Sequence, residues 1–368
     1  MSKKTVGIIF GGKSAEHEVS LQSAKNIVDA IDKNKYEVVL IGIDKEGKWH
    51  LNDTSSYLKN EHNPKLISLN QSNDPIAFTP GEVSAPFIHA NNAEVMEQLD
   101  VVFPIVHGTL GEDGSLQGMM RIADLPFVGS NVLGSAICMD KEIAKRLLQS
   151  SGIRVAKGLT YTRANRDTIN FETAKKKLGV PMFIKPANQG SSVGVSKVAT
   201  KAEFDTGIRM AFQFDHKVLI EETLIGREVE CSVLGNDNPI ASLPGEVLPR
   251  TEFYSYESKY IDEKGAELAI PADLTDDVVQ KLQQVAVDAF VALQCEGLAR
   301  VDFFLTPDNE VYVNEINTLP GFTKISMYPK LWEVSGIPYD ELINRLLELA
   351  IERHENEKVL KDSVWGDI

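Results

Sequence analysis

Cysteine is scarce in this sequence of 368 residues, and the three that occur are widely separated, at Cys138, Cys231 and Cys295. Their odd number and their spacing argue against a disulfide framework and against a zinc site. The apolar segment Thr5–Gly12 is far too short to cross a membrane, and it lacks the features of a signal peptide. We therefore expect a cytoplasmic protein that does not bind membranes.

Positive charge is also in short supply. Lys and Arg number 38 against 53 Asp and Glu, which gives a formal net charge of −15. A surface that binds nucleic acid needs a basic footprint, so this balance argues against a nucleic-acid partner. A phosphate site remains compatible with it, because a few lysines placed together create a local positive field. The length indicates two or three globular domains.

The first third of the chain alternates strand and helix signals. The expected strands are Thr5–Phe10, Tyr36–Asp44 and Asp100–Val106, and the expected helices are Val19–Ile31 and one that begins near Ser115. Such alternation is typical of a parallel sheet with crossover helices. Residues 52–95 are polar and give no clear assignment.

The remainder suggests two further units. The second should contain helices at Asp140–Ser151 and Lys201–Phe212 and strands at Val180–Pro186, Val193–Val198 and Lys217–Glu222. The third should contain strands at Glu228–Leu234 and Pro239–Pro244, helices at Thr275–Leu293 and Tyr339–Glu355, and a hairpin at Leu298–Ile316. The polar stretch Pro249–Gly265 has no clear period, and a loop of this length inside a compact domain is often functional.

The hairpin carries acidic residues in register. If Asp308 and Asn309 form a two-residue turn, Asp302 lies opposite Glu315 and Arg300 opposite Asn317, all on one face. Opposed carboxylates repel, and a divalent cation between them would remove the repulsion. The alternative is a solvent-facing hairpin whose arginine neutralises the acids, and a different turn length would break the shared face.

Two further segments could bind a nucleotide. Lys185 ends a strand and is followed by the small-residue loop Gly190–Gly194, whose backbone N–H groups could contact phosphate oxygens; an ordinary hairpin turn is the alternative. The strand end Leu219–Glu222, with Glu228 beyond it, could offer backbone groups to adenine and a carboxylate to ribose hydroxyls. By itself, an acidic strand end is more often simply solvated.

Two glycine-rich junctions, Gly11–Ser20 and His107–Gly114, each follow a strand and precede a helix, where ligands of open α/β sheets bind. Glu16 or Glu18 could hold a substrate ammonium there. Glu18 could instead favour the helix dipole, and a lone histidine such as His107 is more often structural than catalytic.

Taken together, these segments resemble the D-alanine–D-alanine ligase family of the ATP-grasp superfamily, from about Val6 to Met327. Six strings occur in the family's order: GGKSAEHEVS, HGTLGEDG, IKPANQGSSVG, FYSYESKY, RVDFF and NEINTLPGFT. The resemblance implies an α/β and α+β fold, with an N-terminal parallel-sheet α/β domain followed by two ATP-grasp subdomains. The corresponding expected bounds are 1–135, 136–222 and 223–368, and a homodimer is expected from the family alone.

The resemblance also implies roles for individual residues. ATP would be bound by Lys141, Lys185, Ser191, Ser192, Glu221, Glu222, Leu224, Glu228 and Lys259. Two Mg²⁺, or Mn²⁺, would be held by Asp302, Glu315 and Asn317. The two D-alanine substrates and the reacting groups would be contacted by Glu16, His107, Ser191, Tyr260, Arg300, Gly321, Ser326 and Met327. Glu222 departs from the family, in which relatives often carry a basic residue beside adenine.

The implied chemistry converts a D-alanine carboxylate into an acyl phosphate, which the amine of a second D-alanine attacks. The loop that carries Lys259 and Tyr260 would close over this intermediate. A tyrosine at position 260 marks dipeptide ligases in the family, whereas phenylalanine accompanies acceptance of D-lactate. The alternatives are a D-alanine–D-lactate ligase, another ATP-grasp ligase, and a silent nucleotide-binding regulator; intact Arg300, Asp302 and Lys259 weigh against the last.

Overall fold

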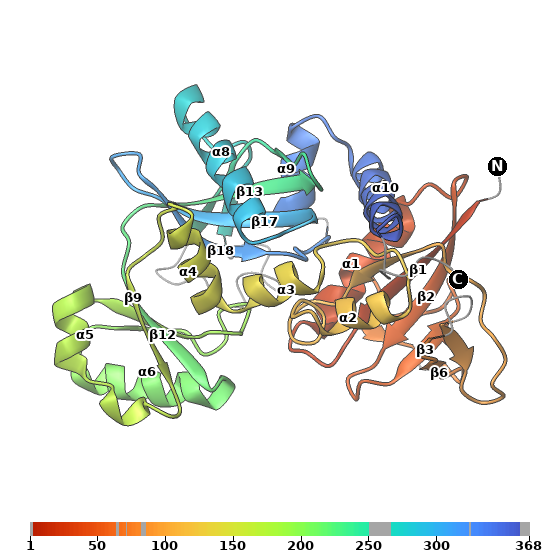
Figure 1. The fold of residues 1–368 in the computed structure, drawn as a ribbon, viewed down its shortest axis with the longest axis horizontal. Coiled ribbons are helices and arrows are strands. Elements are labelled where there is room, and N and C mark those ends of the chain that lie inside the picture. The colour runs from red at the N-terminus through yellow and green to blue at the C-terminus, as the bar shows by residue number, and fades with distance from the viewer. Residues whose placement is uncertain are drawn as a thin grey trace.

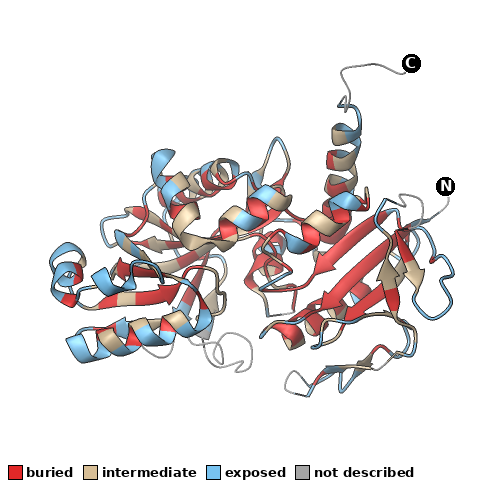
Figure 2. Ribbon diagram, turned by 60° about the horizontal axis from the view of Figure 1, so that its bottom comes forward, coloured by how far each residue is buried: buried red, intermediate tan, exposed pale blue. Residues whose placement is uncertain are grey.

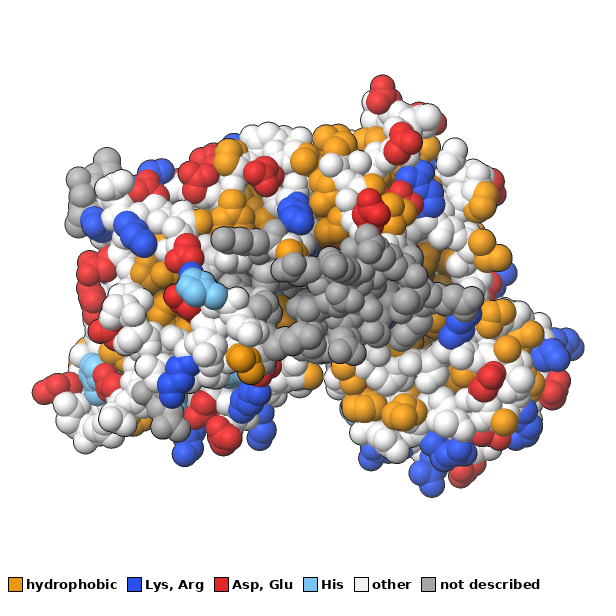
Figure 3. All heavy atoms as spheres, turned by 180° about the vertical axis from the view of Figure 1, so that it is seen from behind, with side chains coloured by type: hydrophobic (Ala, Val, Ile, Leu, Met, Phe, Trp, Pro, Cys, Tyr) orange, Lys and Arg blue, Asp and Glu red, His pale blue; other side chains and the backbone are white. Residues whose placement is uncertain are grey.

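The computed structural model places three sheet-containing units along the chain, with the N-terminal unit on one side of Figure 1 and the other two on the opposite side. The structure describes residues 3–63, 66–70, 72–81, 86–249, 266–323 and 325–360. Within those ranges, none of the helices is both long and apolar enough to span a membrane. On the face shown in Figure 3, acidic and basic side chains of the described residues are interspersed.

The N-terminal unit is a mostly parallel sheet, as expected. Its strand order is β3-β2-β1-β8, and β1 pairs in parallel with both β2 and β8. The strands are β1 (Lys4–Gly11), β2 (Tyr36–Ile43), β3 (Trp49–Asn52) and β8 (Val101–Ile105). Residues 52–95, for which the sequence predicted no secondary structure, contain two small antiparallel strand pairs. These are β4 (Leu58–Lys59) with β5 (Ser68–Leu69), and β6 (Ile76–Phe78) with β7 (Phe87–His89).

Helices cover both faces of this sheet, which is why β1 and β8 are buried along almost their whole length (Figure 2). Ile8 and Phe10 belong to a core with α1 (His17–Ala30) and α10 (Tyr339–Lys358). Ile9, on the opposite face, belongs to a core with α2 (Ser115–Ile122). The last long helix of the chain therefore completes the core of the first unit.

The central unit is an antiparallel sheet of order β11-β10-β12-β9 with two helices on one face. Its elements are β9 (Gly158–Thr162), the 3₁₀ turn Arg166–Thr168, α5 (Phe171–Leu178), β10 (Met182–Pro186), β11 (Ser196–Val198), α6 (Lys201–Phe214) and β12 (Lys217–Glu222). Thr200 and Glu203 begin α6 with a reciprocal capping box.

The third unit has the order β16-β15-β13-β17-β18, with β14 paired to β13. Its elements are β13 (Arg227–Gly235), β14 (Ile240–Ala241), β15 (Gly245–Pro249), β16 (Ala266–Ala269), α8 (Asp276–Ala292), β17 (Gly297–Leu305), β18 (Val311–Asn317) and α9 (Met327–Val334). Leu282 and Phe290 of α8 pack on Val301 of β17. Two consecutive helices, α3 (Val132–Met139) and α4 (Lys141–Ser150), join the first unit to the others.

Candidate active site

A cavity of about 110 Å³ lies where the three units meet. Glu16 comes from the N-terminal unit, Ser191 from the loop after β10, and Arg300 and Glu315 from the hairpin β17–β18. Sequence-predicted residues that line this cavity are Glu16, His107, Ser191, Arg300, Glu315, Asn317, Gly321, Ser326 and Met327. Residues separated by up to about 300 positions in the sequence are thus brought to one site.

Three carboxylates stand side by side across three neighbouring strands. Glu230 of β13 lies opposite Asp302 of β17, which in turn lies opposite Glu315 of β18. Directly opposed like charges destabilise a sheet unless something compensates them. Arg300 provides part of the compensation: its Nε and Nη2 each lie 2.7 Å from an oxygen of Asp302, and its Nε lies 2.8 Å from Oε2 of Glu230.

The predicted pairing of the hairpin is confirmed, but the predicted turn is wrong. Thr306 pairs with Glu310, so the turn has three residues, and Asn309 takes a positive φ of 59°. This length alone would have slipped the register by one residue. A bulge at Asn314, between the pairs Asp302–Glu315 and Phe303–Val313, restores the register and brings the acids onto one face.

The carboxylate row and the adjacent amide form an all-oxygen set that suits Mg²⁺. Asn317 donates to Oδ2 of Asp302 over 3.1 Å, so the three predicted metal ligands lie together. Asp302 is engaged by Arg300, and Glu315 lies 3.4 Å from Nζ of Lys141. A divalent cation could therefore be accommodated here by replacing positively charged partners that already compensate the acids.

Lys141 reaches this set from the start of α4. Its Nζ donates to the carbonyl oxygen of Gln189 over 2.8 Å, in the loop after β10. Asp140 caps the helix by accepting from the backbone N–H groups of Glu142 and Ile143. The cap and the Gln189 contact fix the ammonium between the hairpin acids and the small-residue loop.

Lys185, at the end of β10, forms a buried triad with Glu221 and Lys145. One oxygen of Glu221 lies 2.7 Å from Nζ of Lys185, and the other lies 2.5 Å from Nζ of Lys145. Burial would raise the pKa of Glu221, but the two ammonium groups outweigh it and lower the pKa to about 2. Because Glu221 is fully committed to these lysines, only its backbone remains available to an adenine.

The same triad makes a pH-dependent contribution to stability. Burial lowers the pKa of Lys145 to about 8, from an ordinary 10.5, although Glu221 opposes the change. Between these two values the unfolded chain binds a proton that the folded protein does not, so this group's contribution to stability rises with pH. We expect the wild-type protein to gain stability relative to Lys145→Met as the pH rises through this interval. Urea unfolding of both proteins measures it, and equal pH slopes would contradict it.

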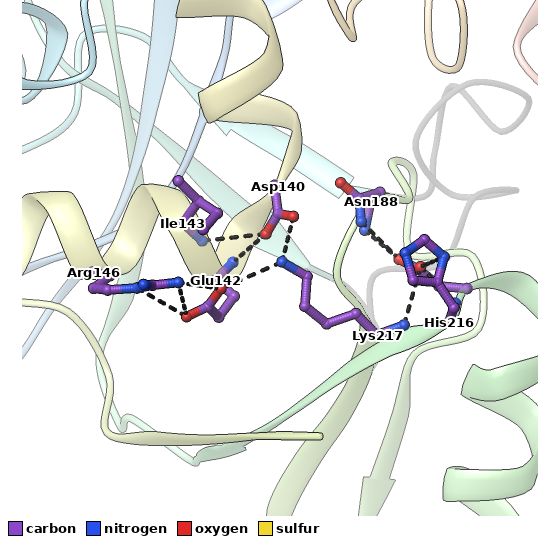
Figure 4. Close-up of polar contacts among 8 residues, drawn as sticks. Asp140, Glu142, Ile143, Arg146, Asn188, His216 and Lys217 are labelled. Atoms are coloured by element: carbon purple, nitrogen blue, oxygen red, sulfur yellow. Dashed lines mark hydrogen bonds and ion pairs between the residues drawn. The ribbon is translucent and has the colours of Figure 1, made fainter. Parts of the chain in front are cut away.

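Helix α4, which carries Lys141 and Lys145, is anchored to the central sheet by a separate ionic cluster (Figure 4). Lys217, at the start of β12, forms an ion pair with Asp140 and lies 3.3 Å from Glu142, which also binds Arg146. In the same region, Asp215 accepts from the backbone and the side chain of Asn188. These contacts fix α4 and the end of β10 against the central sheet, and so fix Lys141, Lys145 and Lys185 relative to one another.

The loop after β10 is held in an unusual conformation. Ser191 and Ser192 have φ angles of 53° and 60°, and Gly194 one of 71°. A Cβ at Gly194 would come within 2.7 Å of the Phe214 ring and 2.9 Å of Pro186, so only glycine fits. Ser191 donates a short hydrogen bond to Glu16, which links the loop to the N-terminal unit. The predicted proximity of these two residues is present in the structure.

Glu112 is half-buried, and its carboxyl lies near that of Glu16. It lines both the main cavity and a smaller adjoining one, and its Oε2 accepts from the backbone N–H of Gly108 over 2.9 Å. Burial, followed by the negative charge of Glu16, raises the pKa of Glu112 well above its ordinary value. Both effects favour the protonated form of Glu112 relative to that of an exposed glutamate.

His107 positions the loop that follows β18 rather than presenting a free base. Its Nδ1 lies 3.1 Å from the carbonyl oxygen of Leu319, which can only accept, so Nδ1 carries the proton. Its Nε2 lies 3.1 Å from Oγ of Ser23, and Ser23 accepts from the Phe322 N–H. Burial lowers the pKa of His107, which keeps the ring neutral. The sequence-based suspicion of a structural histidine agrees with this geometry.

Gly321 and Ser326 lie within this loop and at the start of α9. Ser326 accepts from the Thr323 N–H over 3.0 Å, and a Cβ at Gly321 would lie 2.8 Å from its Oγ. Met327, the first residue of α9, is buried beside them. The loop therefore presents backbone and hydroxyl groups to the cavity that Arg300 also lines.

The remaining predicted nucleotide contacts lie along the connector between the central and third units. Glu222 accepts from the Lys157 N–H over 2.8 Å, Leu224 is half-buried in the connector, and Glu228 is half-buried on β13. Pro249, where the predicted closing loop was expected to begin, ends β15 instead, and residues 250–265, with Lys259 and Tyr260, lie outside the described residues.

Three residues of the site escaped the sequence reasoning, although signals for them exist. Lys145 follows Lys141 by four positions, which places both on one side of a helix. Glu230 follows Glu228 by two, which places both on one face of a strand. Glu112 lies within the string HGTLGEDG, but an acid in a glycine-rich loop gives no hint that it will line a cavity.

Comparison with known proteins assigns the family. Residues 5–130 match the family described as D-ala D-ala ligase N-terminus, and residues 147–348 match D-ala D-ala ligase C-terminus. The D-alanine–D-alanine ligase of Shouchella clausii is 66% identical over 365 residues, covering 99% of both chains, and ligase A of Salmonella typhimurium is 57% identical over 364 residues, covering 99% of this chain and all of the relative.

Comparison with solved structures points to the same family. The D-alanine–D-alanine ligase of Coxiella burnetii superimposes with a TM-score of 0.85 at 39% identity, covering 98% of this chain and 97% of that one. The VanG D-Ala:D-Ser ligase of Enterococcus faecalis gives a TM-score of 0.84 at 36% identity, covering 95% and 100%. The sequence matches span nearly the whole chain, and the chain accordingly belongs to the D-alanine–D-alanine ligase family.

Proposed function

We propose that this protein joins two D-alanine molecules into D-alanyl-D-alanine at the expense of ATP, through a D-alanyl phosphate, and so supplies a precursor of peptidoglycan. The observation that carries the proposal is the convergence on one cavity of Glu16, Arg300 and Glu315, with Asp302 paired directly opposite Glu315. Because ATP is the phosphoryl donor, we place the reaction in the cytoplasm.

The first step transfers the γ-phosphoryl group to the carboxylate of the first D-alanine. Lys141 and Lys185 would lie along the phosphates, beneath the N–H groups of the Gly190–Gly194 loop, and Ser192 would contribute there. Asp302, Glu315 and Asn317 would hold Mg²⁺, which supplies charge neutralisation of the phosphoryl oxygens when bound. We propose two ions, with Mn²⁺ as a substitute.

The second step is attack on the acyl phosphate by the amine of the second D-alanine. Glu16, fixed by Ser191, would hold the ammonium of the first substrate. Arg300 and the Gly321 N–H would stabilise the tetrahedral oxyanion, and Ser326 with the adjacent backbone near Met327 would take the carboxylate of the second substrate. Preorganised donors of this kind are worth roughly 10²–10³-fold in rate each.

The proposal is tested by product analysis with D-alanine alone and in competition with D-serine and D-lactate. We expect ADP, phosphate and D-alanyl-D-alanine in equal amounts. The similarity to a D-Ala:D-Ser ligase makes D-serine the second candidate for the attacking substrate. If the main product contained D-serine or D-lactate, the protein would be assigned as a ligase for that second substrate. If no phosphate were released, the chain would be a nucleotide-binding regulator.

Tyr260 should control which nucleophile is accepted. By the family resemblance, the Tyr260 hydroxyl would partner Ser191 and Glu16, and leaving such polar groups unpaired costs roughly 1–3 kcal/mol. We therefore expect Tyr260→Phe to keep dipeptide synthesis and to gain measurable D-alanyl-D-lactate synthesis. Chromatography of products formed with both nucleophiles present measures the ratio. An unchanged ratio would show that specificity is set elsewhere.

We also propose a homodimer as the working state. Sedimentation of the purified chain tests this independently of the activity.

A further inference from the structure

The row of acids contains one member that the proposed chemistry does not use. Glu230 lines the cavity, and its side chain is 14% exposed. Its Oε2 lies 2.8 Å from Nε of Arg300, while both oxygens of Asp302 lie 2.7 Å from nitrogen atoms of the same guanidinium. Arg300 is therefore shared between two carboxylates on neighbouring strands.

These contacts conflict with the binding of a cation by Asp302. Arg300 and Asn317 together donate three hydrogen bonds to Asp302, which has about four acceptor sites, and the guanidinium charge repels a metal ion at the fourth. A cation that recruits Asp302 must displace the guanidinium, and a displaced, largely buried arginine needs another anion. Glu230 is already in contact with it, and the Glu230–Asp302 pairing of β13 and β17 holds that carboxylate in place.

We propose that Glu230 is a positioning residue that retains Arg300 in the cavity when Asp302 turns to a divalent cation. This inference rests on the proposed function, because it takes Asp302 as a metal ligand and Arg300 as the group that faces the oxyanion. Glu230 lets one arginine compensate the acids in the free protein and face the reacting carbonyl in the loaded one.

The inference is tested by Mn²⁺ binding in the presence of ADP, followed by electron paramagnetic resonance, on the full chain carrying Glu230→Gln, Arg300→Gln or both. Without the Glu230 charge, Arg300 stays on Asp302 and competes with the ion, so we expect Glu230→Gln to weaken Mn²⁺ binding roughly tenfold. In the Arg300→Gln background, Glu230→Gln should have almost no effect on Mn²⁺ binding, because the arginine through which Glu230 acts is absent.

An equal loss in both backgrounds would show that Glu230 attracts the ion directly and would overturn the inference, as would no loss in either. If the double variant does not fold, the kinetics of the single variant Glu230→Gln still test the proposal. In steady-state assays, Glu230→Gln should lower kcat roughly tenfold with little change in KM for ATP, and excess Mg²⁺ should leave kcat low because Arg300 is no longer retained. Recovery of the full kcat at high Mg²⁺ would contradict the role.

Glu246→Gln provides the matched control. Glu246 pairs with Arg227 through two nitrogens, on a strand next to β13, and neither residue lines the cavity. This variant also removes one carboxylate from an arginine fork, but it should leave Mn²⁺ affinity unchanged. If the wild-type protein formed no ADP from ATP and D-alanine, the proposed function would fail, whereas the binding cycle would still report whether Glu230 acts through Arg300.

Discussion

Glu315→Gln should abolish ligation while leaving the protein folded. Glu315 closes the row of acids and is expected to bind Mg²⁺, and the amide that replaces it keeps the shape but loses the charge. Several kcal/mol of charge stabilisation would be lost at the phosphoryl group, so we expect kcat to fall by at least roughly 1,000-fold. Phosphate release with saturating ATP, Mg²⁺ and D-alanine measures the fall.

Glu310→Gln is the control for this substitution, because Glu310 lies on the same hairpin but pairs with Arg154 and Lys281 away from the cavity. We expect it to retain wild-type activity. Near-normal Mg²⁺-dependent turnover by Glu315→Gln would remove Glu315 from the metal site, and circular dichroism of both variants checks that their folds are intact.

Glu221→Gln should cause a large loss of stability. Its carboxylate is the partner of two buried ammonium groups, Lys145 and Lys185. Removing one member of a buried ionic network leaves uncompensated charge and costs about 3–5 kcal/mol, a large part of the stability of a typical domain. Urea unfolding at low temperature measures the free energy of unfolding.

The neighbouring residue provides the comparison. Glu222 contacts the Lys157 backbone and lies 3.7 Å from its ammonium, so Glu222→Gln should cost no more than about 1 kcal/mol. Adding Lys145→Met to Glu221→Gln should recover part of the loss, because one fewer ammonium is left unpaired. A small cost for Glu221→Gln alone, or none recovered in the double variant, would show that the triad is hydrated rather than closed.

The elements with strong periodicity could be predicted from the sequence, since β1, α1, β12, α8, β17 and α10 lie within a few residues of their expected bounds. Short elements escaped. The residues of α3 are mostly apolar, and so short an apolar run does not distinguish a helix from a buried strand. The short pairs β4–β5 and β6–β7 carry too few residues for any pattern to show.

In the candidate site, too, some features could be predicted from the sequence and others could not. Asp302 and Glu315 could be paired from the sequence because the strand period is local, although two deviations, a longer turn and the Asn314 bulge, had to cancel. The shared role of Glu221 could not be predicted, since its lysines come from a separate strand and helix. Interactions across units depend on how the sheets pack, and no local pattern encodes that.

The packing of α10 on the N-terminal sheet has a consequence for how the protein is made. During synthesis, the segment with Ile8 and Phe10 leaves the ribosome long before Leu342 and Leu346, which share its core. The growing chain therefore carries an incompletely covered apolar sheet face until Tyr339–Lys358 have been translated. Contacts across such long stretches of sequence form slowly, and uncovered apolar surface promotes aggregation. We expect truncation before Tyr339 to yield insoluble protein, although every residue of the candidate active site would still be present.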